Sequence, residues 1–445
     1  MKILRFAIAA AAVVGSVPVF ATNARVESMG KNSTFIMDDI SIFDNPANIN
    51  LYPNFLIGEL GNYLYSNTEP GQNKDPLDAW FGGIFSLKVS ADNSLSIAGV
   101  LNRKEERLLK YFPDYIRDAD IRDASKKKAP VPVTNFDGFL GANLDDKAFG
   151  VHIYVAHQDG LSGDDEITSN AFVSALQLDI GTNIEISNDY SIEISGGGAR
   201  MQYGPRNSKF LESDLLSKFF DIRMFSRINA INGHLIPAAF FRNMNAPGRD
   251  ELDVGGGMGV DAAFDRGFFW MGLKGFYNKQ RAGSTWTKDV NGETTYTDNI
   301  ISDDTWGSQL TSLQQIGGTI SFGIERNIWW DWFVLRVGGQ KTIAYAKYDR
   351  PDAETINSNS INNDINNSIL CPTSVEQGGC KSNGNYFITN PANDGTRGDN
   401  VGFGFGINIE EKLKIDATVA EDVVFRNPFQ GEGRLISRIS ATYSF

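Results

Sequence analysis

The sequence predicts an all-β fold, a transmembrane antiparallel β-barrel of about fourteen strands. Three observations predict it. Apolar and polar side chains alternate in many segments of about ten residues, connections are short at one end of these segments and long at the other, and aromatic residues cluster near segment ends. No internal run of 18 apolar residues occurs, which excludes membrane-spanning helices.

The alternation is clearest in residues 401–410, where Val, Phe and Ile fall on one face and three glycines, Asn408 and Glu410 on the other. Residues 252–264 and 316–325 show the same pattern. A strand of about 9–11 residues, tilted near 45°, is long enough to span a bilayer. A soluble β-sandwich alternates too, so the alternation alone does not decide the class.

The connections favour the membrane barrel. The short ones are 90–94, 144–148, 265–267 and 410–412, and the long ones are 103–134, 204–234, 280–312 and 347–398. Short turns at one end and long loops at the other are typical of outer-membrane barrels. Several loops of this length are unusual in a compact soluble domain.

Fourteen segments qualify as strands, which is an even number and closes an antiparallel barrel without a free edge. They are 55–65, 79–89, 93–103, 136–145, 148–157, 170–180, 190–203, 251–264, 267–279, 314–325, 332–346, 399–409, 411–421 and 434–445. A further strand near 235–243 is uncertain.

Residues 1–21 form the expected signal peptide, with Lys2 and Arg5 before an apolar stretch and a small residue at its end. We expect cleavage after Ala21 and export to the bacterial outer membrane. The formal net charge of −13 argues against nucleic-acid binding, which needs clustered Lys and Arg. The acidity is explained by solvated loops or, alternatively, by divalent cations that bridge the surface to lipopolysaccharide; outer-membrane lipid and lipopolysaccharide are expected partners.

Two further features agree with export. Cys371 and Cys380 are the two cysteines of the chain, and their close spacing in an exported protein predicts a loop disulfide. The last strand alternates up to Tyr443 and the terminal Phe445. An aromatic ending of this kind resembles the assembly signal that the barrel-assembly machinery recognises.

No motif predicts catalysis, a cofactor or a metal site, so we expect no enzyme activity. His152 lies on the polar face of residues 148–157, where a structural role facing the lumen is favoured over a catalytic one.

Residues 24–49 carry a family resemblance. Met29-Gly30, then Asp38-Asp39, then Asn45-Pro46-Ala47 resemble the N-terminal segment of a superfamily that holds the FadL-type long-chain fatty acid transporters and the PorV-type proteins of type IX secretion. The run "KNSTF" after Met29-Gly30 departs from that pattern, and the gap before Asn45 is one residue short. The resemblance implies a fourteen-strand barrel whose N-terminal segment folds inside as a hatch. The expected divisions are therefore a hatch over 22–53 and a barrel over 54–445.

A barrel of this size has a lumen too wide for its own side chains to fill, which favours a segment inside it. Pro46 fixes the local backbone, and Asp38 and Asp39 are suited to pair with basic groups in the lumen. By alternation these groups are Arg200, Lys274 and Arg336. The alternative is that residues 37–49 form a periplasmic turn outside the barrel.

Three consecutive glycines, Gly196, Gly197 and Gly198, permit a kink or bulge in their strand. In FadL-type barrels a kinked strand opens a lateral path from the lumen to the membrane. Packing against a segment in the lumen would also explain these glycines.

Three functions remain open at this point. The barrel transports a hydrophobic small molecule, such as a fatty acid or an aromatic compound; it acts as a PorV-like partner for secreted protein cargo; or it is a structural barrel. The pair Met29-Gly30 is typical of the secretion-linked branch.

Overall fold

The fold is described from a computed structural model of the chain. It describes residues 23–30, 34–35, 39–60, 79–90, 93–103, 105, 115–116, 127–128, 134–159, 171–187, 190–205, 213–226, 228–230, 233–245, 249–282, 284–288, 294–298, 301–303, 308–310, 312–349, 383–388, 400–410, 412–419 and 436–445. The expected signal peptide, Asp38, and the pair Cys371 and Cys380 lie outside these residues.

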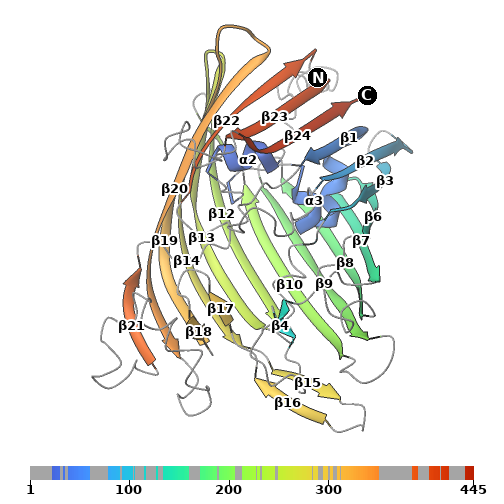
Figure 1. Ribbon diagram of the computed structural model, residues 1–445. Coiled ribbons are helices and arrows are strands. Elements are labelled where there is room, and N and C mark those ends of the chain that lie inside the picture. Colours follow the sequence, from blue (N-terminus) through green and yellow to red (C-terminus); the bar gives the residue numbers. More distant parts are fainter. Residues whose placement is uncertain are drawn as a thin grey trace.

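The described part is a single large barrel preceded by short helices (Figure 1). The helices are α2 (Asn23–Ser28), α3 (Ser41–Asp44) and the 3-10 helix η1 (Pro46–Leu51). No helix among the described residues is long and apolar enough to cross a membrane.

Sixteen strands pair in sequence as an antiparallel ring. They are β1 (Phe55–Leu60), β2 (Ala79–Lys88), β3 (Asn93–Leu101), β6 (Thr134–Leu144), β7 (Lys147–Asp159), β8 (Ala171–Ser187), β9 (Tyr190–Pro205), β10 (Ser213–Ser226), β12 (Gly233–Asn245), β13 (Arg249–Phe264), β14 (Gly267–Ala282), β19 (Ser312–Asn327), β20 (Phe333–Asp349), β22 (Asn400–Ile409), β23 (Leu413–Val419) and β24 (Ile436–Ser444). The first and last strands pair along their length, which closes the barrel.

The remaining strands are short. β11 (Ile228–Ala230) pairs with β12, and β21 (Asn383–Ile388) pairs with the end of β20. Three small two-stranded sheets lie between barrel strands: β4 (Tyr115–Ile116) with β5 (Lys127–Lys128), β15 (Ser284–Lys288) with β16 (Thr294–Asp298), and β17 (Ile301–Asp303) with β18 (Ser308–Leu310).

The expected count of fourteen strands is wrong, because the barrel has sixteen. The strand left uncertain near 235–243 is β12, and the predicted long connection 204–234 contains β10. β10 has apolar residues on both faces, as in the doublet Phe219-Phe220, so its alternation is weak. Pro237 makes β12 look unlike a central strand, because proline cannot donate to the ladder.

The two ends of the barrel differ as expected. The connections at one end are turns of a few residues, such as those around Asp145, Arg266 and Glu410. These three residues have positive φ values of 53°, 58° and 51°, which is the geometry of tight hairpin turns. The N- and C-terminal ends of the described barrel meet at this short-turn end, where the Phe445 amide donates to the Asn54 carbonyl at 3.1 Å. The long connections lie at the opposite, long-loop end (Figure 1).

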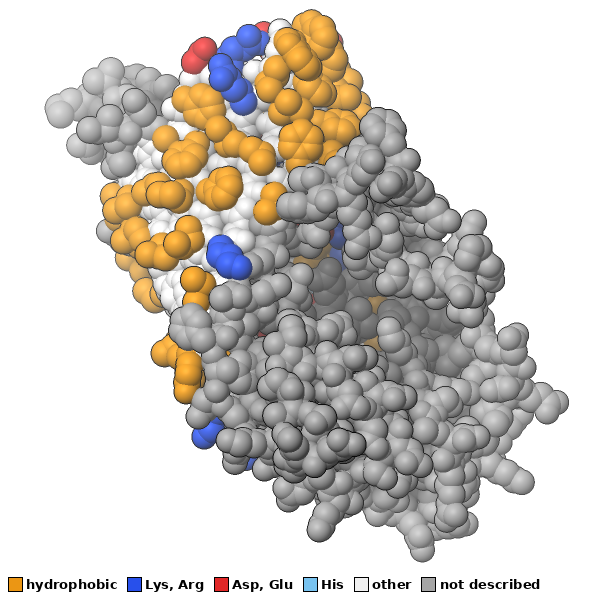
Figure 2. Space-filling model, turned by 60° about the vertical axis from the view of Figure 1, so that its left-hand side comes forward, with side chains coloured by type: hydrophobic (Ala, Val, Ile, Leu, Met, Phe, Trp, Pro, Cys, Tyr) orange, Lys and Arg blue, Asp and Glu red, His pale blue; other side chains and the backbone are white. Residues whose placement is uncertain are grey.

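Side chains sort by face along every well-described strand. Large apolar residues are exposed on the outward face, for example Leu140, Ile180, Leu273 and Ile320 at 59–60%. Figure 2 shows this apolar surface over one side of the wall, interrupted by few Lys and Arg side chains. The inward face is polar and buried, and its members include Asn135, Asp137, His152, Gln177, Asp179, Thr319, Ser321 and Thr342. An apolar exterior around a polar interior is the pattern of a barrel that spans a bilayer.

Candidate functional site

Residues 23–30, 34–35 and 39–52 contact the inward faces of strands around most of the ring. We call these residues the N-terminal segment. Its three short helices are buried, with Ala24, Ser28, Ala47 and Asn48 all at 0% exposure. In Figure 1, α2 and α3 lie within the ring of strands. The segment therefore packs against the inward side of the wall on several sides of the barrel.

Inward-facing glycines give this segment the room it needs. A Cβ atom added to Gly150 of β7 would lie 2.2 Å from the Pro46 backbone, and one added to Gly181 of β8 would lie 2.0 Å from the Asn45 side chain. On the other side, a Cβ at Gly402 of β22 would lie 2.0 Å from the Glu27 carbonyl oxygen. These distances are far below van der Waals contact, so any larger residue would displace the segment or the wall.

Gly30 is needed for its backbone conformation as well as for its small size. Its φ of +92° lies in the left-handed region, and an added Cβ would lie 2.7 Å from the backbone nitrogen of Gly339 on β20. Met29 before it is fully buried against β20 and in a cluster with Phe35, Ile236, Ala238 and Trp270. The pair Met29-Gly30 therefore places one large side chain in the core and turns the chain where only glycine fits.

A chain of buried charges holds α2 to the wall. Arg25 Nε donates to Glu325 Oε2 at 2.8 Å, Arg336 Nε donates to the same oxygen at 2.6 Å, and Arg336 Nη1 lies 2.6 Å from Asp416 Oδ1. The signs alternate along this row, and the Arg25 side chain is only 3% exposed. The Coulomb energy in this arrangement is large only because the partners are close and sheltered from water.

A second group of charges lies beside it. Arg438 of β24 contacts Glu27 of the segment at 3.2 Å and Glu59 of β1 at 3.1 Å. The Thr418 hydroxyl of β23 donates to the Ala24 carbonyl at 2.8 Å. Three strands, β19, β23 and β24, thus hold α2 directly through charged or hydrogen-bonded side chains.

Residues 34–35 cross to the strands on another side. Arg223 of β10 donates to the Thr34 carbonyl at 3.3 Å, and the Lys274 ammonium of β14 contacts the Thr34 hydroxyl at 3.3 Å. The Phe35 ring lies over Gly259 and Gly272, where an added Cβ would meet ring atoms at 2.8 Å and 2.3 Å.

Asn45-Pro46-Ala47 forms the start of η1. The Asn45 side chain accepts from the Ala47 amide at 3.1 Å and donates to the Thr182 carbonyl of β8 at 3.2 Å. Pro46 occupies the first position of η1, where its missing N–H leaves no unpaired donor. This motif therefore caps a helix and attaches it to the wall at the same time.

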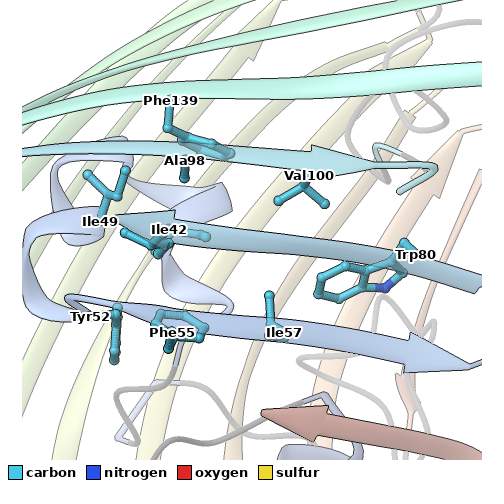
Figure 3. Close-up of a cluster of buried hydrophobic side chains, with 10 residues drawn as sticks. Ile42, Ile49, Tyr52, Phe55, Ile57, Trp80, Ala98, Val100 and Phe139 are labelled. Atoms are coloured by element: carbon cyan, nitrogen blue, oxygen red, sulfur yellow. The ribbon is translucent and has the colours of Figure 1, made fainter. Parts of the chain in front are cut away.

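An apolar cluster anchors α3 and η1 (Figure 3). Ile42, Ile49 and Tyr52 of the segment pack with side chains from four strands, which are Phe55, Ile57, Trp80, Ile84, Ala98, Val100 and Phe139. Phe43 adds edge contacts to Trp80 at 6.0 Å and to Phe139 at 5.7 Å between ring centroids.

Beside this cluster lies a buried charged network. His152 Nε2 is 2.8 Å from Asp137 Oδ1, and His152 Nδ1 is 2.8 Å from Asp179 Oδ2. Arg103 binds the Asp137 carboxylate with two nitrogens, at 2.7 Å and 3.2 Å, and Glu105 at 2.7 Å. A neutral imidazole has one N–H, so donation to both aspartates requires the protonated ring.

The same network is the one metal-like cluster among the described residues. Glu105, Asp137 and His152 offer ligand atoms within 4.8 Å of one another. Arg103 already binds both carboxylates, and its guanidinium lies 3.7 Å from the Phe43 ring centroid. The charges are thus satisfied by a cation from the chain, and the network fits an anchor for Phe43 better than a metal site.

One of the basic groups expected in the lumen is placed wrongly, and the pairing with Asp38 and Asp39 stays a prediction. Arg336 and Lys274 face inward, where Arg336 pairs with Glu325 and Asp416 and Lys274 contacts Thr34. Arg200 is exposed on the outward face of β9, because the inward positions of this strand are 193, 195, 197 and 199. Asp39 is fully buried.

Sequence reasoning missed Arg25, Arg103 and Phe43, which make contacts between segment and wall. No pattern around Arg25 marks it in the sequence, because Glu27 and Lys31 lie close to it. Tyr443 and Phe445 lie on the outward surface, at 42% and 54% exposure, and their role as an assembly signal stays a prediction.

The strand pairing runs without a register shift through Gly196, Gly197 and Gly198 on both sides of β9. These glycines line an apolar recess of about 1470 Å³ in the outward surface of β2 to β10. Leu140, Leu178 and other outward apolar side chains complete its walls. The lateral path remains a prediction.

No family model and no curated protein matches the chain. Solved structures that resemble it include the toluene transporter TodX of Pseudomonas putida, at 10% identity and a TM-score of 0.37, with 96% of this chain and 98% of TodX covered. OmpT, an outer membrane protein of Vibrio cholerae, is 9% identical with a TM-score of 0.31, covering 88% of this chain and 97% of OmpT. The copper transporter OprC is 11% identical with a TM-score of 0.38, covering 64% of this chain and 42% of OprC. The chain therefore spans less than half of the length of OprC. The likeness is one of fold.

Proposed function

We propose that the protein is a bacterial outer-membrane barrel for the uptake of hydrophobic small molecules, and that the N-terminal segment is its hatch. The observation that carries the proposal is the buried, ion-paired segment inside a closed barrel with an apolar exterior. A sixteen-strand barrel without such a segment encloses an aqueous channel. A solute therefore crosses only when the segment moves or when a side path opens around it.

The membrane position follows from the outward surface. Exposed apolar residues cover the wall, and Trp329, Trp330 and Trp332 cluster at the short-turn end with exposures of 73%, 53% and 44%. Tryptophans at the margin of an apolar band favour the bilayer interface. We place this end at the periplasm, because outer-membrane barrels carry their short turns there.

Two features favour a hydrophobic solute. The N-terminal motif resembles that of the FadL-type transporters, and an apolar recess lies in the wall beside Gly196, Gly197 and Gly198. Strand glycines have no side chain to pack, so this part of the wall is the weakest place for a lateral exit into the membrane. We propose that the solute leaves the lumen there.

A reversible lock tests whether the hatch must move. An ideal Cβ on Gly404 of β22 lies 2.5 Å from the Ser28 Cβ of α2, and a shift of about 1 Å brings the pair to disulfide geometry. The variant Ser28→Cys/Gly404→Cys, with both native cysteines replaced by serine, should lose uptake when oxidised and regain it on reduction. Each single cysteine variant serves as the control. Full uptake by a completely cross-linked barrel would show that the hatch does not move.

Uptake itself is measured in a deletion strain with radiolabelled long-chain fatty acid, a monoaromatic hydrocarbon and a disaccharide. We expect expression of the protein to restore uptake of one of the two hydrophobic classes and not of the sugar. Equal uptake of all three with and without the protein would rule out the transport function.

The second candidate is a PorV-like partner for secreted proteins, favoured by the close fit of Met29-Gly30 against β20. Affinity purification from detergent extracts distinguishes it. Recovery of secreted cargo or secretion machinery with the barrel, together with unchanged uptake of hydrophobic compounds, would support this candidate over transport.

A further inference from the structure

Four basic residues lie on the outward face near the long-loop end of the wall between β10 and β20. They are Lys218 on β10, Lys279 and Arg281 on β14, and Lys347 on β20, and we call them the basic row. All four are exposed, and each shares its strand face with exposed apolar residues closer to the middle of the wall, such as Phe220, Tyr277 and Tyr345.

The strand register places these residues along one line across the wall. Lys279 lies opposite Gln314 of β19, and Gln314 lies opposite Lys347. Arg281 lies two residues above Lys279 on the same face. Adjacent strands are about 4.8 Å apart, so the backbones of Lys279 and Lys347 are roughly 10 Å apart.

Lys218 extends the row along the polar positions of the next strands. It lies opposite Asn245 of β12, which lies opposite Asp250 of β13, which in turn lies opposite Arg281. Asp250 accepts a hydrogen bond from the Asn245 side chain at 2.7 Å. The same register line continues from Arg281 through Ser312 to Asp349 of β20, so it holds two acidic positions, Asp250 and Asp349.

The basic row differs from the cations that face inward. Within the part of the chain that the structure describes, none of the four has a hydrogen bond or an ion pair. Inside the lumen, Arg25, Arg336 and Arg438 are all paired with carboxylates. At the short-turn end, Arg266 is paired with Asp331, whereas the exposed Lys88, Lys147 and Lys412 have no ion pair among the described residues. The basic row is set apart from these lysines by its position, because four exposed cations at the long-loop end attract a negative partner there in a chain with net charge −13.

The surface directly below the row fits acyl chains. Two residues deeper on the same faces, Tyr277 and Tyr345 are 36% and 46% exposed, with Ile316 at 59% between them. Tyrosines at this level mark the boundary between the head-group region and the hydrocarbon of a membrane. A partner that contacts both the basic row and the tyrosines below it carries negative charge on its head group and has hydrocarbon chains beneath.

We propose that the basic row binds the phosphate groups of lipopolysaccharide in the outer leaflet. The row lies at the long-loop end, which faces the cell exterior in outer-membrane barrels. Lys and Arg near a membrane surface attract anionic head groups, and the Arg fork matches a phosphate with two parallel hydrogen bonds. This inference rests on the membrane position of the barrel and is independent of transport.

The test uses the purified full chain in detergent, with binding followed by native mass spectrometry and thermal unfolding. The probes are bisphosphorylated lipid A, the same lipid without phosphates, phosphatidylethanolamine and inorganic phosphate. We expect bisphosphorylated lipid A to bind and raise the unfolding temperature, and the other three to bind at least tenfold more weakly. Equal binding of lipid A with and without phosphates, or of inorganic phosphate alone, would overturn the proposal.

The variant Lys218→Gln/Lys279→Gln/Arg281→Gln/Lys347→Gln should lose about a thousandfold in affinity for lipid A. The matched control replaces exposed lysines at the short-turn end, as Lys88→Gln/Lys147→Gln/Lys412→Gln, and should bind as the parent does. Arg281→Gln alone gives a smaller loss if the fourfold variant does not fold. Unchanged lipid A affinity in a folded variant would refute the assignment, and binding of an acidic protein in place of lipid A would also count against it.

Discussion

Replacing Arg25 by alanine should release the N-terminal segment from the wall. Arg25 contributes the cation at one end of the row Arg25, Glu325, Arg336 and Asp416, and its loss leaves three buried charges with a net charge of −1. Two unit charges about 4 Å apart interact by about 4 kcal/mol at an effective dielectric constant of 20. Breaking a buried pair costs about 3–5 kcal/mol, and Glu325 keeps Arg336 at 2.6 Å, so we expect a loss near the lower limit.

A loss of about 3 kcal/mol raises the population of the released segment roughly a hundredfold. Amide hydrogen exchange of residues 23–30 measures this population, because the Met29 amide donates to the Arg25 carbonyl at 3.2 Å and the Gly30 amide to the Glu27 carbonyl at 3.1 Å. These amides should exchange about a hundred times faster in Arg25→Ala, under conditions where the segment recloses faster than an open amide exchanges. Conductance in planar bilayers should rise in parallel.

The matched control is Arg242→Ala. Arg242 pairs with Asp221 at 2.7 Å between β12 and β10, and this contact joins two strands of the wall. Its removal should leave exchange of residues 23–30 within about threefold of the parent. If Arg25→Ala also stays within that range, the buried ion pair does not hold the segment and the reasoning fails.

Three further predictions follow from close contacts. Gly150→Val should push η1 from the wall through Pro46 and raise single-channel conductance, whereas Gly275→Ala, whose nearest atoms lie 3.9 Å away on the outward face, should leave conductance unchanged. His152→Ala leaves two buried aspartates without the ring between them and should lower the free energy of unfolding by about 3 kcal/mol in denaturant titrations; a change below about 1 kcal/mol would contradict the ion-pair description. Gly30→Ala should cost about 1–3 kcal/mol, read as a lower unfolding temperature, because of both its φ and the clash with β20.

The strands of the wall could be predicted from the sequence where small or polar residues lie on one face of the strand and apolar residues on the other. β13 and β22 follow that rule, and both were found. β10 does not follow it, because apolar residues such as Phe219, which is 8% exposed, face inward. The alternation criterion assumes polar inward side chains, and it fails where the inward side chains are apolar.

The contacts between segment and wall were harder to predict for a geometric reason. Alternation gives the face on which a residue lies, so Arg336 and Lys274 were placed inward as the structure has them. The partner of each depends on strand register and on where the segment lies, and neither is encoded within ten residues of the side chain. Arg336 thus pairs with Glu325, eleven residues away across a turn, and with Asp416 on another strand pair.

The inward glycines allow some contacts between the segment and the wall to be predicted from the sequence. Gly402 and Gly404 of β22 stand opposite outward Val and Phe residues, and strand glycines weaken packing unless a backbone approaches closely. Both lie against α2, as Gly150 and Gly181 lie against the start of η1. Outward-facing Gly275 has no such neighbour, so glycine content alone is not the signal. The signal is a glycine at an inward position of a strand whose outward side is apolar, and it marks where the segment inside the barrel approaches the wall.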